Sequence, residues 1–122
     1  MTKIVTFKDL IAWQEGLKLT LSIYRITKLF PRDELFVLTA QMRRCAISVT
    51  SNIAEGFSRR NKKEKNQFYY IALGSLTELH NQVITSRELD YISINDFDKI
   101  ENQIILVHKL LNGLLKSSVN YT

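Results

Sequence analysis

Five basic side chains gather within seven residues in the middle of the chain. They are Arg59, Arg60, Lys62, Lys63 and Lys65, and with the acid Glu64 they give this segment a net charge of +4, five basic minus one acidic. Cations at this density can bind phosphates, and backbone amides at the start of a helix can add to an anion site. Lysines near a helix N-terminus are also unfavourable by about 0.3–1 kcal/mol. The cluster is therefore a candidate nucleic-acid-binding site, and the alternative is a solvated loop without function.

Two aromatic residues, Tyr69 and Tyr70, follow the basic cluster closely. Exposed aromatic rings beside cations can stack nucleic-acid bases. Aromatic residues in helices more often pack against other helices, so both interpretations of this pair remain open.

A polar stripe lies between residues 41 and 55. Its members recur at three- and four-residue spacing on one side of a helix: Gln41, Arg44, Ser48, Asn52 and Glu55. One interpretation is a solvated face with pairs one turn apart. The other is a hydrogen-bonded strip that faces another helix or subunit, in which Arg44 contacts Glu78 or Glu55, because a guanidinium suits carboxylates. Neither interpretation implies catalysis.

Residues that usually carry catalysis are scattered along the chain. The sequence has no His-Glu-x-x-His motif, no Glu-x-x-His motif and no glycine-rich phosphate loop. His80 and His108 fall on different predicted helices, and Cys45, the single cysteine, is predicted to be a small core residue. We therefore expect no enzyme activity, no metal site and no cofactor.

Helices must position these side chains. The chain has 122 residues, of which 45% are hydrophobic and 24% charged, with one proline and four glycines. This composition predicts a single domain over residues 1–122, built from a few long helices. Apolar periodicity and capping residues predict helices over 9–30, 33–55, 62–87 and 94–116. Because the connections are short, the expected fold is an all-α, antiparallel up-and-down four-helix bundle.

The first predicted helix carries two apolar stripes on nearly opposite sides. We expect Trp13, Leu17, Leu21 and Tyr24 to face the core of the bundle. The second stripe consists of Leu19, Ile23, Ile26 and Phe30. Since four large apolar side chains are rarely exposed together, we predict that the second stripe is an oligomer interface.

Two glycines have predicted structural roles. Gly56 stands just after the second predicted helix, where a left-handed capping residue commonly lies. Gly74 lies inside the third predicted helix beside Ala72 and Ser75. A helical glycine costs about 1 kcal/mol relative to alanine, and a close helix–helix approach would compensate for it.

Neither a signal peptide nor a membrane span is expected. The first ten residues lack the long apolar run of a secretory signal, and no apolar run approaches the roughly 20 residues of a membrane helix. We therefore expect a soluble, cytoplasmic protein.

Three segments, FKDLIAWQEGLKL, QMRRCAISVTSNIAEGFSRRNKKE and FYYIALGSLTEL, resemble the bacterial family of 23S rRNA intervening-sequence proteins. The similarity covers nearly the whole chain and extends distantly to the accessory variability determinant of retroelements. It implies a four-helix bundle that assembles as a homopentamer. The family commonly has Arg-Ala-Ala and Ser-Ile-Pro where this chain has Arg44-Cys45-Ala46 and Ser48-Val49-Thr50. Without that proline, a kink in the second helix loses its usual cause.

The leading functional prediction is a non-enzymatic oligomeric bundle that binds RNA, or a nucleoprotein partner, through its basic cluster. The alternative is a structural or protein-interaction module that binds no nucleic acid. Residues 87–101 carry five acids and two basic side chains and should stay away from any nucleic acid.

Overall fold

Four helices make up the computed structural model, which describes residues 3–117. They are α1 (Ile11–Thr27), α2 (Leu38–Ser58), α3 (Lys62–Glu88) and α4 (Ile94–Ser117). Two short 3-10 turns precede α1 and α2, η1 (Phe7–Asp9) and η2 (Arg32–Glu34). No helix within residues 3–117 is long and apolar enough to cross a membrane.

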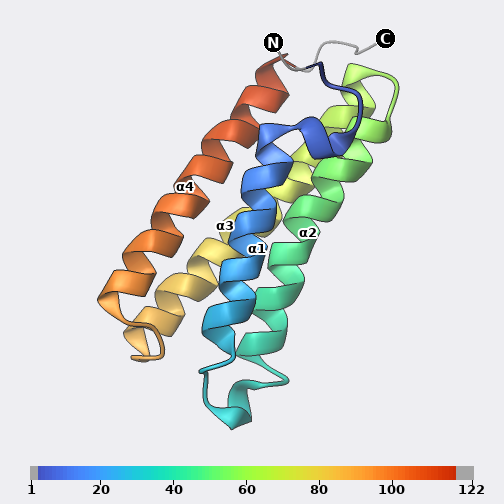
Figure 1. The fold of residues 1–122 in the computed structure, drawn as a ribbon. Helices are drawn as coiled ribbons and strands as arrows, with labels where there is room; N and C mark the ends of the chain where they lie inside the picture. Colours follow the sequence, from blue (N-terminus) through green and yellow to red (C-terminus); the bar gives the residue numbers. More distant parts are fainter. Residues whose placement is uncertain (1–2, 118–122) are drawn as a thin grey trace.

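The helices form an up-and-down bundle (Figure 1). Each helix packs against its neighbours in the chain, and α4 closes the bundle by packing against α1. The start of α1 and the end of α4 lie at the same end of the bundle as the α2–α3 connection (Figure 1). The predicted all-α four-helix bundle is confirmed.

The connection between the first two helices is longer than predicted. α1 ends at Thr27, three residues before the predicted end, and α2 begins only at Leu38. Pro31 caps η2 between them, and Val37 has a φ of −118° and a ψ of −95°, which lie outside the helical region. Residues 33–37 therefore belong to the connection and not to α2.

The core face of α1 is mainly the second predicted stripe and not the first, although Trp13 of the first stripe packs partly buried against the core. Leu19, Ile23 and Phe30 are buried, and Ile26 packs partly buried against the same core. Leu17 and Leu21, predicted to be core residues, are exposed. The prediction that the stripe of Leu19, Ile23, Ile26 and Phe30 is an oligomer interface is therefore wrong, because a single chain already buries these side chains.

Small residues explain which face of α1 turns inward. Ala12 and Gly16 lie on the same side of the helix as Leu19 and Ile23, and both are buried. A Cβ atom at Gly16 would lie 3.1 Å from the Cγ2 atom of Thr50. The missing side chain thus lets α2 approach this face of α1 closely.

Gly56 lies inside α2 and does not cap it. The described glycines have no positive φ angle, and α2 continues to Ser58. A Cβ atom at Gly56 would lie 2.6 Å from the Cε1 atom of Tyr69, which is buried. The glycine makes room for the tyrosine ring, so the predicted left-handed cap is wrong.

Gly74 is exposed on α3, and no heavy atom lies within 4 Å of the position that a Cβ atom would occupy. The predicted close helix–helix approach at this residue is therefore wrong within the single chain.

We expect Gly74→Ala to raise the free energy of unfolding by up to about 1 kcal/mol, because alanine restricts the unfolded chain. Urea denaturation should show a higher midpoint with an unchanged slope. A lower midpoint would indicate that another molecule packs on this surface.

Candidate nucleic-acid interface

The basic cluster lies at the connection between α2 and α3. Arg59 has extended backbone angles and ends α2, and the side chain of Asn61 caps α3 by accepting a hydrogen bond from the Glu64 amide at 2.9 Å. This cap confirms the predicted start of α3. The tight connection leaves Arg60, Lys62 and Lys63 exposed at one end of the bundle.

Arg59 is held in place by its neighbours. Its guanidinium carbon lies 4.6 Å from the centre of the Phe68 ring, and its Nη2 atom lies 3.2 Å from Oε2 of Glu55. An exposed cation–π contact contributes roughly 0.5–1 kcal/mol, and an exposed ion pair contributes about 0–1 kcal/mol. Because Glu55 shares its charge, Arg59 offers less to a phosphate than the other cations do.

Lys65 does not belong to the exposed cluster. Its side chain is 2% exposed, and its Nζ atom donates a hydrogen bond of 2.8 Å to the carbonyl oxygen of Phe57. Burial lowers the pKa of this amine from its ordinary value. The prediction that Lys65 binds nucleic acid is therefore wrong. The position of Lys65 in α3 explains its burial. Lys65 stands one helical turn before Tyr69 and two turns before Ala72, and both of these residues are buried.

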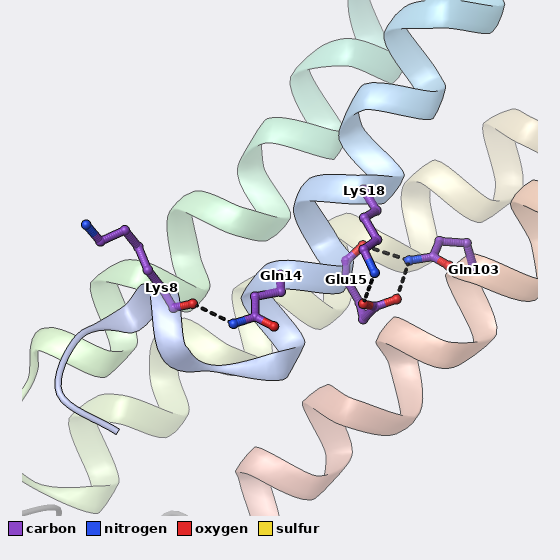
Figure 2. A network of polar contacts seen from close by, with 5 residues as sticks. All are labelled: Lys8, Gln14, Glu15, Lys18 and Gln103. Atoms are coloured by element: carbon purple, nitrogen blue, oxygen red, sulfur yellow. Dashed lines mark hydrogen bonds and ion pairs between the residues drawn. The ribbon is translucent and has the colours of Figure 1, made fainter. Parts of the chain in front are cut away.

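Further cations lie at the same end of the bundle. Lys8 in η1 and Lys116 near the end of α4 are both exposed. Figure 2 shows the Lys8 ammonium pointing away from the bundle, while its carbonyl oxygen accepts a hydrogen bond of 2.8 Å from Gln14 Nε2. The opposite end includes the α3–α4 connection, where acidic side chains outnumber basic ones.

Glu15 joins α1 to α4 (Figure 2). Its carboxylate accepts hydrogen bonds from Lys18 Nζ at 2.8 Å and from Gln103 Nε2 at 3.2 Å, and Gln103 also donates to the Glu15 carbonyl at 2.9 Å. These bonds, the one from Lys18 first, lower the pKa of Glu15. The carboxylate thus stays ionised and has a structural role.

The polar stripe divides into a partly buried half and an exposed half. The hydroxyls of Ser48 and Ser75 lie 2.8 Å apart between α2 and α3, and Asn52 Nδ2 donates to the Ser48 carbonyl at 2.8 Å. Gln41 and Arg44 are exposed, and among residues 3–117 no ion pair joins Arg44 to a carboxylate. The interpretation in which Arg44 bridges to Glu78 or Glu55 is therefore wrong.

Glu78 instead contacts the buried thiol. Cys45 Sγ donates a hydrogen bond of 3.2 Å to Glu78 Oε2. Burial, together with the nearby carboxylate, raises the pKa of the Cys45 thiol to about 11. A thiol with this pKa remains protonated at neutral pH and is a poor nucleophile, in agreement with the predicted core role.

The two histidines lie in different surroundings. His80 Nε2 lies 2.8 Å from Glu101 Oε2 and joins α3 to α4, whereas His108 is exposed. No group of three or more potential metal ligands occurs among residues 3–117.

An apolar groove of about 620 Å³ lies between the start of α1 and the end of α4. Within the described chain its only ionisable lining residue is Asp9, whose carboxylate accepts hydrogen bonds from the amides of Val5 and Thr6 at 2.9 Å each. The groove therefore brings no pair of reactive groups together.

Comparisons with known proteins agree with this fold. The family described as 23S rRNA-intervening sequence protein matches residues 8–113. A solved structure from Bacteroides thetaiotaomicron VPI-5482, described as a protein with unknown function from the S23 ribosomal protein family, is 22% identical and superposes with a TM-score of 0.81. That similarity covers 90% of this chain and 99% of the other. No curated protein matches the chain.

Proposed function

This chain belongs to the 23S rRNA-intervening sequence protein family, and from that membership we propose that it is a non-enzymatic bundle that binds RNA through the exposed cations of the α2–α3 connection. These cations are Arg60, Lys62 and Lys63, with a smaller contribution from Arg59. The name of the family connects its members with ribosomal RNA. The negatively charged phosphates of RNA suit a cationic surface.

One observation carries the proposal. Arg60, Lys62 and Lys63 are exposed, and none of them forms an ion pair within residues 3–117. The two lysines of this set stand at the start of α3, where the helix dipole disfavours positive charge. Placing them there costs stability, and a phosphate ligand would offset that cost.

The expected binding is electrostatic and largely independent of sequence. Contacts from lysine and arginine to phosphates position a nucleic acid without reading its bases. Each neutralised phosphate contributes a slope of about 0.7 for a single strand, or 0.9 for a duplex, when the logarithm of the affinity is plotted against that of the salt concentration.

The test replaces the three free cations with glutamine. We expect the triple variant Arg60→Gln, Lys62→Gln and Lys63→Gln to bind a labelled RNA hairpin about tenfold or more weakly at low salt, with a salt slope smaller by about 2. Fluorescence anisotropy at several salt concentrations measures both quantities. The fold should be unchanged, because all three side chains are exposed.

A matched control neutralises three exposed cations nearer the other end of the bundle: Arg25, Lys28 and Lys99. This variant loses the same net charge and should retain most of the affinity. If the two triple variants lose affinity equally, the α2–α3 connection is not the binding site. If the wild-type protein binds no RNA at low salt, the protein-interaction module is the better description.

We also propose that the protein is a homo-oligomer, with the pentamer that the family resemblance implies. Leu17 and Leu21 on α1 and Ile47 on α2 are exposed apolar residues. The hydroxyl of Thr20 donates to the Ala46 carbonyl at 3.3 Å, which brings the neighbouring Leu21 and Ile47 to the same level of the bundle. These three residues form one apolar surface that a second copy would cover.

Oligomerisation would strengthen RNA binding. A closed ring repeats the same basic cluster on every subunit, so that several weak phosphate contacts act together on one RNA. The affinity of the whole assembly can then exceed that of one subunit without any new kind of contact.

A further inference from the structure

The structure separates the two adjacent tyrosines that follow the basic cluster. Tyr69 is buried against Gly56, whereas Tyr70 is 61% exposed. Most of the Tyr70 ring is therefore available to a ligand, while Tyr69 serves the core.

Tyr70 shares an exposed face of α3 with Lys63. Seven residues separate them, which corresponds to two helical turns and a rise of about 10 Å. The exposed side chain of Gln67 lies between them on this face. Since long side chains of a helix generally lean towards its N-terminus, we expect the Tyr70 ring to lie over the turn on the side of the basic cluster.

The surface beyond Tyr70 is open. Gly74 stands one turn later on the same face, and no heavy atom lies within 4 Å of the position that its Cβ atom would occupy. A flat group that stacks on the tyrosine ring would meet no side chain at this position.

We propose that Tyr70 is a stacking platform for an unpaired base of single-stranded RNA whose phosphates contact Arg60, Lys62 and Lys63. The inference rests on the proposed function, and it adds that the bound RNA is single-stranded. Base stacking on an aromatic ring requires a base that is free of its own helix, which single strands and loops provide and a continuous duplex does not. Lysines alone would bind both forms through their phosphates.

The exposed position of Tyr70 makes a clean test possible. Removing a side chain that is mostly solvated should change the stability of the fold little. Phe36 supplies a matched control, because its ring is 89% exposed in the connection at the opposite end of the bundle.

The experiment measures the affinity of four proteins for three labelled ligands by fluorescence anisotropy. The proteins are the wild type, Tyr70→Ala, Tyr70→Phe and Phe36→Ala. The ligands are a single-stranded RNA, a blunt duplex of the same sequence, and an abasic ribose-phosphate strand of the same length. We expect Tyr70→Ala to bind the single strand about 5- to 100-fold more weakly, and Tyr70→Phe to retain the affinity.

The other ligands locate the effect on the bases. Tyr70→Ala should bind the duplex and the abasic strand as the wild type does, with an unchanged salt slope, because the phosphate contacts remain. Phe36→Ala should match the wild type with all three ligands. Equal affinity of Tyr70→Ala and wild type for the single strand would overturn the stacking proposal.

The glutamine triple variant separates this failure from failure of the proposed function. If the triple variant loses RNA binding while Tyr70→Ala does not, the cations bind RNA and the stacking proposal is wrong. If the wild type binds none of the three ligands, the proposed function and the stacking proposal fail together.

Discussion

Ile23→Asp should unfold the protein and not merely dissociate an oligomer. The Ile23 side chain is 0% exposed, so the variant places a carboxylate in the core of the single chain. An unpaired buried charge, added to the loss of a large apolar side chain, is expected to cost about 4 kcal/mol or more. Since small domains are stable by only about 5–15 kcal/mol, circular dichroism and urea denaturation should show a largely unfolded or strongly destabilised chain.

Leu21→Asp is the matched control for this prediction. Leu21 lies on the same helix but is 53% exposed, so the same new charge remains in water. We expect this variant to keep the helical spectrum and, if α1 and α2 form the oligomer interface, to have a lower mass by light scattering. A folded Ile23→Asp variant of reduced mass would instead restore the original assignment of this stripe to an interface.

Tyr69→Ala is expected to have an effect of similar size. Tyr69 is among the largest fully buried side chains, and its ring fills the space beside Gly56. Deleting a buried aromatic side chain typically costs about 3–5 kcal/mol, because apolar contacts are lost and a cavity remains. The midpoint of urea denaturation should fall accordingly, and a loss below about 1 kcal/mol would contradict the observed packing.

Gly56 supplies the control through a double-mutant cycle. In the wild type, Gly56→Ala should lower the free energy of unfolding by about 1–3 kcal/mol, because its Cβ atom would overlap the Tyr69 ring. In the Tyr69→Ala background the overlap with the ring is gone and only the 3.1 Å approach to the Lys65 carbonyl oxygen remains, so the same change should cost less. An equal cost in both backgrounds would show that the ring is not the reason for a glycine at this position.

The class of fold followed from local properties of the sequence. Apolar periodicity, Asn61 as a capping residue and a single proline between the first two helices depend on neighbours within one or two turns. Because such signals are local, the sequence alone was enough to predict four helices. The short connections between them predicted that neighbouring helices are antiparallel. The least accurate boundary, the start of α2, lies where η2 replaces the expected first turn.

The inward face of α1 depended on tertiary structure. Both stripes of this helix are apolar, so periodicity alone does not choose between them. The choice depends on how closely α2 can approach, which Gly16 allows against Thr50 on the side of Leu19 and Ile23. Gly16 was the signal available in the sequence. It could identify the inward face only once Thr50 was known to lie opposite it.

For the candidate binding surface, too, the sequence determined one part and the tertiary structure another. The sequence alone determined that positive charge concentrates between α2 and α3, because charge is a property of each residue and the connection is short. Only the tertiary structure separated the buried Lys65 and Tyr69 from the exposed Lys63 and Tyr70. Neighbours in sequence point in different directions from a helix, and the packing of α2 against α3 decides which directions remain open to water.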